Sequence, residues 1–345
     1  MRVLATGATG LIGCHAAARL AAAGHEVRAL VRDAGKLARV LAPFPSASLR
    51  IETWLGDVTD SASVRAALAG CGAVLHCAGV FSHSLADAAR LRRVNVEGTR
   101  FVLGAAAEAG LAPIVHVSSM LALRATGPVL RADDPVAEPR GIYAATKADA
   151  ERVARELQRR GAPVVCVYPS STHGPHDPTV GSGPELIATT LRSGRVLVTE
   201  GGLAYTDVRD LAALLGALLG PGVAPPRIMA PSAFLPHDRS HALLCALTGR
   251  RLEALRIPGW LLRAVGHAGD LGQRLLGRPV RLTSEAAAVL TRSRPVDDGE
   301  ARKLLGADPI PLADSFRDLL VWMYRAGVLG SYHVGRLVDE AGDAG

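Results

Sequence analysis

Short apolar segments alternate with longer amphipathic ones from Met1 to Pro169. Short apolar runs are typical of buried strands in a parallel sheet, and apolar residues every three or four positions are typical of the helices that cover it. The predicted strands are Val3–Thr6, Val27–Val31, Leu49–Trp54, Ala73–Cys77, Ile114–Ser118 and Val164–Tyr168. Helices are predicted over Cys14–Ala23, Leu91–Ala105 and Gly141–Arg160.

The order of these segments predicts an α/β fold, with a Rossmann doubly wound parallel sheet in residues 1–169. Beyond this region glycines and prolines interrupt the pattern, and residues 205–228 are expected to return to the sheet with a strand and a helix around Tyr205–Leu219. Residues 170–204 and 229–328 are expected to form a smaller, mostly helical lobe that binds the substrate. Residues 329–345 are expected to be a tail.

The composition favours a soluble globular protein. The 345 residues are 49% hydrophobic, which is enough for a sizeable core. The net charge of +7 comes from scattered arginines, and only 4% of the residues are aromatic and able to stack on bases, so no nucleic-acid partner is expected. The charge is instead expected to attract an anionic cofactor. Asp177, Asp207 and Asp210 lack the spacing of a metal site, so no metal is expected.

Three features bear on location. The five cysteines lie far apart, without the paired spacing of zinc or redox sites, and glycines interrupt the first apolar run before it reaches the length of a signal peptide. We therefore expect a cytoplasmic protein with reduced thiols, and a homodimer is compatible with the sequence. Leu211–Gly220, the most apolar stretch, is about half as long as a bilayer-spanning helix, so no stable membrane insertion is expected. Gly259–Leu262 and Val265 could form a pocket lid or a membrane-surface helix, but packing within the small lobe is favoured.

Three glycines lie between the first predicted strand and its helix, in the segment Gly7-Ala-Thr-Gly10-Leu-Ile-Gly13. Glycines here let the backbone turn tightly and approach a pyrophosphate closely, at the positive N-terminus of a helix. Their place at a strand-to-helix junction favours a dinucleotide site over a plain glycine turn.

Further motifs follow in order along the chain. They are Gly56-Asp57-Val58, His76-Cys77-Ala78-Gly79, Asn95-Val-Glu-Gly98-Thr99, Tyr143-Ala-Ala-Thr-Lys147, Tyr168-Pro169-Ser170 with Gly174-Pro175, and the closing segment Asp297 to Gly327. With the GxxGxxG spacing, they resemble the extended short-chain dehydrogenase/reductase superfamily. This branch includes NAD-dependent epimerases and dehydratases, dihydroflavonol reductase-like enzymes and 3-beta-hydroxysteroid dehydrogenase-like enzymes. The resemblance covers about residues 1–328.

The resemblance implies which residues hold the cofactor. Asp57 would contact the adenine, the Ala78-Gly79 turn would lie beside a ribose, and Lys147 would hold the nicotinamide ribose. The implied set is Gly7, Thr9, Gly10, Leu11, Ile12, Gly13, Asp57, Val58, Cys77, Ala78, Gly79, Asn95, Tyr143, Lys147, Pro169 and Ser170. For Asn95 two interpretations remain open: a helix kink with a proton-relay water, as the resemblance implies, and a polar position that faces solvent.

The end of the second predicted strand bears on cofactor choice. An acidic residue there binds the 2′-hydroxyl of NAD, whereas a basic one pairs with the 2′-phosphate of NADP. Here Val31 is followed by Arg32, with Lys36 just beyond. NADP(H) is therefore favoured over NAD(H), although Arg32 and Asp33 could be ordinary loop charges.

Tyr143 and Lys147 are four residues apart on a predicted helix, so both side chains can reach one pocket. An ammonium and a positive nicotinamide are expected to lower the pKa of the phenol, which lets Tyr143 exchange a proton with the substrate oxygen. The register of the resemblance favours Ser119 as the hydrogen-bond donor to that oxygen, with Ser118 as the alternative. His83 and His173 are weaker candidates for the pocket.

Three functions remain open, and net carbonyl reduction or alcohol oxidation is favoured. The 4,6-dehydratases of the branch carry an Asp-Glu pair after the serine, where this chain has Met120-Leu121. Nucleotide-sugar enzymes commonly have an Arg near Ser170–Thr172, and a diphosphate favours one near Leu203–Thr206, but neither segment has one. A fairly apolar ketone or alcohol is therefore expected. The alternatives are an NAD-dependent nucleotide-sugar epimerase that retains its cofactor and a non-catalytic NADP-binding redox sensor.

Overall fold

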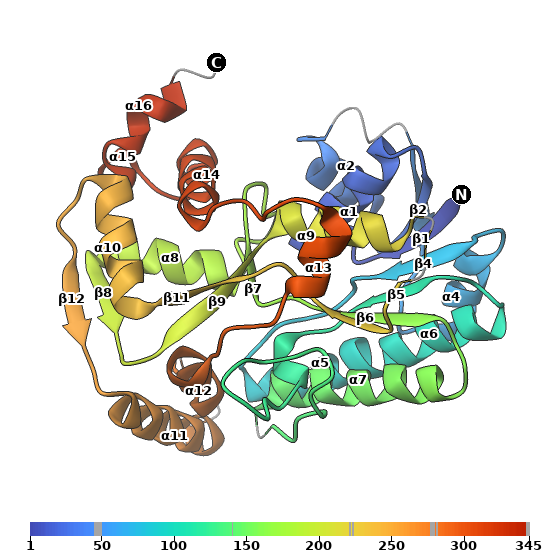
Figure 1. Ribbon diagram of the computed structural model, residues 1–345, viewed down its shortest axis with the longest axis horizontal. Helices are drawn as coiled ribbons and strands as arrows, with labels where there is room; N and C mark the ends of the chain where they lie inside the picture. The colour runs from blue at the N-terminus through green and yellow to red at the C-terminus, as the bar shows by residue number, and fades with distance from the viewer. Residues whose placement is uncertain are drawn as a thin grey trace.

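Seven parallel strands form the central sheet of the computed structural model (Figure 1). The structure describes residues 1–44, 50–139, 141–220, 222, 224–276, 280 and 282–342. Across the sheet the strands are β10 (Arg227–Met229), β6 (Val164–Tyr168), β5 (Ile114–Val117), β4 (Ala73–His76), β1 (Arg2–Thr6), β2 (Glu26–Val31) and β3 (Ile51–Leu55). Six of them confirm the predicted strands to within two residues, and the predicted Leu49 lies outside the described residues. The order reverses beside β1, which is where doubly wound folds bind ligands.

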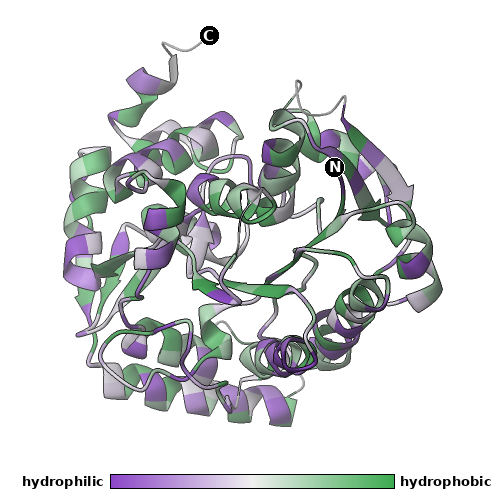
Figure 2. Cartoon of the chain, turned by 45° about the vertical axis from the view of Figure 1, so that its right-hand side comes forward, coloured by the Kyte–Doolittle hydropathy of each residue, from purple (hydrophilic) through white to green (hydrophobic). Residues whose placement is uncertain are grey.

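Helices cover both faces of this sheet (Figure 1). One face carries α1 (Leu11–Ala22), α2 (Ala34–Leu41) and α9 (Val208–Leu218), and the other α4 (Ser61–Leu68), α6 (Thr99–Glu108) and α7 (Ile142–Arg159). Alternate residues of β1 enter the two cores, because side chains alternate along a strand: Val3 packs on one side and Leu4 on the other. Figure 2 accordingly shows hydrophobic colour along the central strands and mixed colour on the covering helices.

The predicted helix over 91–105 is interrupted in the structure. It consists of α5 (Ala88–Leu91), a π-helical segment (Arg92–Gly98) and α6. Asn95 lies in the π-helical segment and is only 3% exposed, so the solvent-facing interpretation of this residue is wrong. Its side chain accepts a hydrogen bond from Val80 N and donates to Val80 O. A π-bulge is a frequent feature of functional sites, because it turns a side chain out of the regular helical pattern.

The second lobe is mostly helical, as predicted, and it also contains two small sheets. One small sheet joins β7 (Ser171–His173), β9 (Gly202–Asp207) and β11 (Ala233–Pro236), and another pairs β8 (Arg195–Val198) with β12 (Glu253–Arg256). The strand expected near Tyr205 therefore joins the small sheet, while α9 and β10 do return to the large one. The helices of the lobe are α8 (Ser182–Ser193), α10 (His237–Thr248), α11 (Gly259–Leu276), α12 (Ser284–Arg292) and α14 (Leu312–Arg325), and α13 (Gly299–Leu305) lies beside α9.

The expectation of a tail from residue 329 is wrong for most of that segment. Residues 331–342 contain α15 (Ser331–Val334) and α16 (Leu337–Gly342). Val334 and Leu337 are buried in the core of the second lobe, together with Phe316 of α14. Apolar side chains at these two positions thus anchor the segment, and the last three residues lie outside the described residues.

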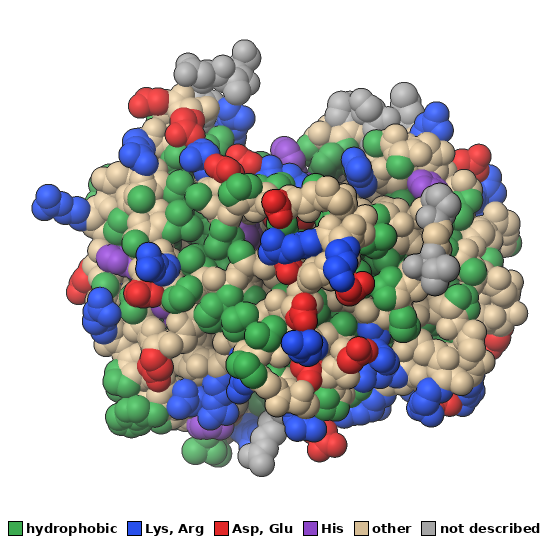
Figure 3. Space-filling view, in the orientation of Figure 1, with side chains coloured by type: hydrophobic (Ala, Val, Ile, Leu, Met, Phe, Trp, Pro, Cys, Tyr) green, Lys and Arg blue, Asp and Glu red, His purple; other side chains and the backbone are tan. Residues whose placement is uncertain are grey.

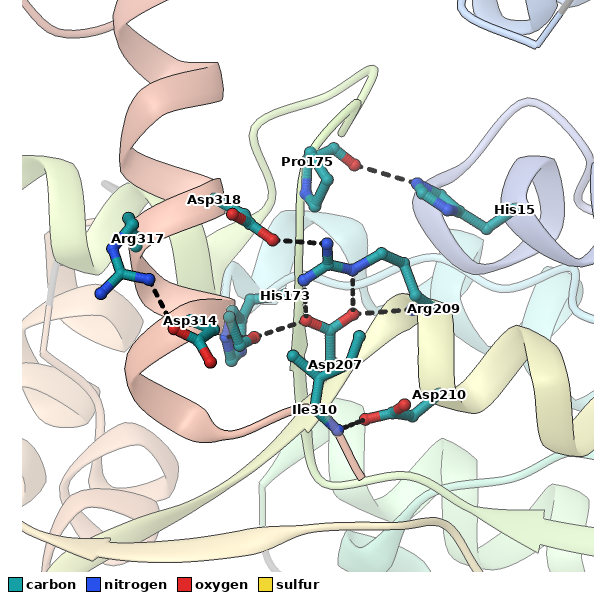
Figure 4. Close-up of polar contacts among 11 residues, drawn as sticks. His15, His173, Pro175, Asp207, Arg209, Asp210, Ile310, Asp314, Arg317 and Asp318 are labelled. Atoms are coloured by element: carbon teal, nitrogen blue, oxygen red, sulfur yellow. Dashed lines mark hydrogen bonds and ion pairs between the residues drawn. The ribbon is translucent and has the colours of Figure 1, made fainter. Parts of the chain in front are cut away.

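A charged cluster joins the two parts of the molecule (Figure 4). Arg209 at the start of α9 donates to both carboxylate oxygens of Asp207. It also donates to Asp318 Oδ2 on α14, at 2.5 Å. Ser315 Oγ, also on α14, donates to Asp207 Oδ2. Burial alone raises the pKa of Asp207, but the hydrogen bonds from Arg209 and Ser315 outweigh it and hold that pKa below its usual value. The cluster therefore fixes α14 against the sheet in its ionised state.

Candidate active site

The glycine loop has the close backbone packing expected of a dinucleotide site. Gly7 adopts a φ of 75°, and a Cβ atom there would lie 2.7 Å from Ala78 N. A Cβ atom on Gly13 would lie 2.1 Å from Gly7 O, so this glycine lets α1 approach the loop. At Gly10, the N-cap of α1, no side chain caps the helix, and a Cβ atom would meet only Gly7 O, at 3.5 Å. The uncapped N-terminus, with Thr9, Leu11 and Ile12 partly exposed around it, fits the pyrophosphate of a dinucleotide.

Arg32 lies at the carboxyl end of β2 with an accessible guanidinium. Its side chain is 67% exposed, and its Nη1 atom is 3.9 Å from Asp57 Oδ2. The other oxygen of Asp57 accepts from Thr59 N and Thr59 Oγ1, which orients the carboxylate. Lys36 is half-buried in the first turn of α2, one turn beyond. Both basic residues are thus near the ends of β2 and β3, where a ribose phosphate could pair with them.

The turn after β4 is tied to its neighbours. Ala78 N donates to Thr6 Oγ1 at 3.2 Å, which joins the ends of β4 and β1. Asn95 fixes the next residue, Val80, through two hydrogen bonds of 2.7 and 2.9 Å and also donates to Thr146 of α7. The predicted residues Cys77, Ala78 and Gly79 therefore lie between the glycine loop and α7. Val58, also predicted, packs against Gly98.

Lys147 is buried against the end of β5. Its Nζ atom donates to Val117 O at 3.1 Å. Burial lowers the pKa of Lys147 to about 8. The rings of His76 and His116 stack nearby with centroids 5.4 Å apart, and burial lowers the pKa of both, that of His76 to about 3. Both imidazoles are therefore neutral at physiological pH, and the ammonium of Lys147 donates its hydrogen bond to the carbonyl of Val117.

Tyr143 lies one turn before Lys147, in the first turn of α7. Its ring meets the ring of Phe81 edge-on, with centroids 4.6 Å apart. Burial, and then the carboxylate of Glu285, raise the pKa of Tyr143 above the ordinary value of a phenol. The expected lowering by Lys147 is therefore not seen in the isolated chain, because Lys147 is directed to Val117 O. Tyr143 is accordingly protonated at neutral pH.

The structure distinguishes the two serines that follow β5. Ser118 Oγ donates at 2.8 Å to the fully buried carboxylate of Glu151, which also accepts from Tyr168 and Arg155. Among the described residues, Ser119 Oγ accepts one hydrogen bond, from Leu121 N at 3.2 Å, and donates none. The hydroxyl proton of Ser119 thus remains available to an incoming acceptor, whereas that of Ser118 is used inside the core.

Pro169 and Ser170 follow the neighbouring strand β6. Pro169 O accepts from Met120 N, directly after Ser119, so the ends of β5 and β6 are joined. Ser170 N donates to Thr206 Oγ1, and Ser170 Oγ lies 3.0 Å from Ser232 Oγ. The carboxyl ends of β4, β5 and β6, together with the start of α7, form one continuous edge, which we call the catalytic edge.

Glu285 of α12 lies at the catalytic edge, although the sequence did not predict it as a site residue. Its Oε1 atom accepts from Ala144 N at 2.7 Å, and its Oε2 atom lies 3.2 Å from His83 Nδ1. The side chain is 8% exposed and leaves no room for a Cβ atom on Gly141. Because Glu285 follows Tyr143 by some 140 residues, only the tertiary fold brings the two together. His83 does lie in this region, beside Phe81.

Other polar features lie elsewhere. His173 is buried on β7, where its Nε2 atom contacts Ser315 Oγ. A cavity of about 180 Å³ lies near the same cluster, and its lining includes Asp210, Ser232 and Arg302 but not Ser119, Tyr143 or Lys147. In the described part of the chain no group of three or more His, Cys, Asp or Glu side chains could hold a metal ion. All five cysteines are free.

A doubly wound sheet with a glycine loop and a Tyr-Lys pair at its carboxyl edge defines a dinucleotide-dependent enzyme fold. The chain belongs to the NAD dependent epimerase/dehydratase family, whose model matches residues 3–227. It is thus an extended short-chain dehydrogenase/reductase, as the motifs indicated, and the enzymes of this superfamily are NAD(P)-dependent.

Relatives of known sequence include two reductases. The putative dihydroflavonol 4-reductase of Synechocystis sp. is 28% identical over 93% of this chain and 94% of that protein. The 4-hydroxy-2-methyl-3-oxo-4-farnesyl-3,4-dihydroquinoline-1-oxide ketoreductase of Stigmatella aurantiaca is 31% identical over 89% of this chain and 91% of that protein. Both alignments extend through the second lobe as well as the sheet.

Solved structures share the whole fold. The crystal structure of gox2253 has a TM-score of 0.77 and 28% identity, and it covers 96% of this chain and 99% of that one. UDP-glucuronic acid 4-epimerase from Bacillus cereus, in complex with UDP-glucuronic acid and NAD, has a TM-score of 0.74 at 16% identity, over 94% of this chain and 100% of that one. At this low identity the second likeness concerns the fold alone.

The contact between Glu285 and α7 leads to a pH prediction. Glu285→Gln keeps the shape and the acceptor for Ala144 N but removes the charge that raises the pKa of Tyr143. That pKa should therefore fall. In the alcohol-oxidation direction, where the phenolate accepts the proton, kcat/KM should reach its high-pH plateau at a lower pH than in the unmodified protein.

The matched control is Asp149→Asn. It removes a charge from α7, the helix that carries Tyr143, at a position where the carboxylate is paired with Arg92 and Arg152. This variant should keep the original pH profile. An identical profile for Glu285→Gln and the unmodified protein would show that Glu285 does not act on Tyr143.

Proposed function

We propose that the chain is an NADP(H)-dependent reductase that interconverts a carbonyl and a hydroxyl on a fairly apolar small molecule. The catalytic residues are Ser119, Tyr143 and Lys147, and the substrate lies between the catalytic edge and the second lobe, whose helix α12 contacts α7. The proposal rests on two proton donors that lie at this edge, the side chains of Tyr143 and Ser119. Tyr143 is a protonated phenol, Ser119 has a free hydroxyl donor, and Lys147 lies one turn away on the same helix.

Each residue has one role in this reaction. Ser119 donates a hydrogen bond to the substrate carbonyl oxygen and holds it beside Tyr143. When bound, a nicotinamide would supply hydride to the carbonyl carbon in reduction and accept it in oxidation. Tyr143 gives its proton to the carbonyl oxygen as the C=O π bond breaks, which leaves an alcohol. Lys147 stabilises the resulting phenolate until a proton from solvent restores the phenol.

The surroundings of these residues support an apolar substrate. Phe81 packs on Tyr143 and is 44% exposed, so an apolar ring borders the reacting group. Arg209, the arginine closest in sequence to β9, is held by Asp207 and Asp318 and is not free to bind a diphosphate. The two reductases among the relatives agree with this choice. A nucleotide-sugar epimerase, which needs cations for its diphosphate, has less support.

Removal of the Tyr143 hydroxyl group tests the mechanism. Tyr143→Phe keeps the ring contact with Phe81 but removes the transferable proton, so kcat should fall by about 10²- to 10⁴-fold, the usual contribution of general acid–base catalysis. The dissociation constant of NADPH, measured by fluorescence titration, should change little. Ser118→Ala serves as a contrast, because we assign its hydroxyl to Glu151 and not to the substrate. Near-normal turnover by Tyr143→Phe would place proton transfer on another group.

The preference for NADP(H) rests on Arg32, whose exposed guanidinium suits a 2′-phosphate. In calorimetric titration NADPH should bind more tightly than NADH, and Arg32→Ala should remove most of the difference, which we expect to be about tenfold for one charge-assisted pair. The control is Arg39→Ala, which removes an exposed arginine from the neighbouring helix α2 and should leave the preference for NADPH intact. Equal affinities of the unmodified protein for both cofactors would contradict the assignment.

A further inference from the structure

Helix α11 exposes an apolar face to solvent. Its large exposed side chains are Trp260, Leu261, Val265, Leu271, Leu275 and Leu276, with exposed fractions from 41 to 74%. At 100° per residue these six and the exposed Ala264 and Ala268 fall within one arc of about 160° around the helix. Scattered exposed apolar residues are ordinary, but a continuous arc of this width along a whole helix indicates an interaction surface.

The face that packs inward is built mostly from small residues. A Cβ atom on Gly266 would lie 2.7 Å from Thr283 O, and one on Gly269 would lie 2.3 Å from Leu282 O. Leu262 and Gln273 complete the buried side. The helix thus packs closely on α12 through glycines and directs its large apolar side chains outward, which is the reverse of a core-packing amphipathic helix. The favoured expectation of simple lobe packing therefore holds for Gly259 and Leu262, which are buried, but not for the exposed Trp260, Leu261 and Val265.

Basic residues border this arc. His267 and Arg274 are exposed along one flank, and Arg256 is exposed just before the helix begins. Asp270, an acidic residue of α11, accepts from Ser284 N of α12 and lies on the inward side. Figure 3 shows green side chains beside blue and purple ones at the lower left, where Figure 1 places α11. An exposed apolar arc with a basic border and a terminal tryptophan is the pattern of a helix that lies in a membrane interface.

The same helix holds the loop in front of Tyr143. Gln273 Oε1 accepts from Leu85 N at 2.5 Å, and Gln273 Nε2 donates to His83 O at 3.3 Å. This loop carries Phe81, which packs on Tyr143, and both Phe81 and Leu85 are exposed. The loop thus carries two exposed apolar side chains, Phe81 and Leu85, between α11 and Tyr143.

We propose that α11 docks the protein on the surface of an anionic bilayer, with its axis in the membrane plane, and that an apolar substrate dissolved in the bilayer reaches Tyr143 along the loop 81–85. The second part rests on the proposed function, whereas the docking itself does not. In the described ranges none of the helices has the length and apolarity needed to cross a bilayer, so α11 lies on the membrane without spanning it. An anionic surface complements both the apolar arc and the net charge of +7, whereas a second copy of this chain would bring the same charge.

The test is co-sedimentation of the full chain with vesicles of phosphatidylcholine and phosphatidylglycerol. Leu271→Glu combined with Leu275→Glu places two charges in the arc at positions 57 and 74% exposed, so folding should be unaffected. Binding should fall by about tenfold or more, since two buried leucines are lost from the interface. Leu304→Glu, at a 42% exposed position on α13, is the matched control and should bind normally. Emission of Trp260 should shift to the blue on binding, and Trp260→Tyr should remove that shift.

The outcomes separate this inference from the proposed function. Failure of the unmodified protein to bind vesicles, or equal binding by the double variant, would overturn the docking of α11. If light scattering shows that the unmodified protein is a dimer and the double variant a monomer, without vesicle binding, the arc would be a contact with a second copy. That result would also overturn the docking of α11 on a membrane. The double variant should still reduce a water-soluble ketone in vesicle-free buffer, because neither leucine belongs to the catalytic edge. Vesicle binding without any ketone reduction would retain the docking and contradict only the proposed function.

Discussion

The catalytic edge depends on one buried cation. Lys147 donates to Val117 O, and this bond joins α7 to the end of β5, so that Tyr143 and Ser119 are presented by elements fixed to one another. A buried ammonium is costly, and burial accordingly lowers its pKa to about 8. A phenolate formed at Tyr143 would supply the missing negative charge. Lys147 would thus stabilise that phenolate once it forms, whereas burial and Glu285 keep Tyr143 protonated at rest.

The second lobe sets the properties of this edge as well as covering it. Glu285 of α12 caps the first turn of α7 through Ala144 N and raises the pKa of Tyr143. Arg209 joins the start of α9 to Asp318 of α14, so the lobe is also fixed at its other end. Movement of α12 away from α7 would remove the carboxylate and shift Tyr143 towards the phenolate.

Much of the fold could be predicted from the sequence, because strands buried on both faces of a parallel sheet appear as apolar runs. Ser119 could be preferred over Ser118 only through the family resemblance, and the bond from Ser118 to Glu151 now gives a physical reason. The strands of the second lobe other than β9 were missed because they are only three or four residues long and lie among glycines and prolines. Glu285 carries no local signal, since its contact with α7 exists only in the tertiary structure. The tail was mispredicted because two buried side chains, Val334 and Leu337, were enough to anchor it.

Transfer of deuterium from labelled cofactor tests net reduction at the catalytic edge most directly. The protein, NADPH deuterated at the transferable position of its nicotinamide, and an apolar ketone are mixed, and the alcohol is examined by mass spectrometry while cofactor absorbance is followed. We expect one deuterium on the carbinol carbon of each product molecule and one cofactor oxidised per product. Interconversion of a nucleotide sugar at constant cofactor absorbance, with no reduction of ketones, would contradict it.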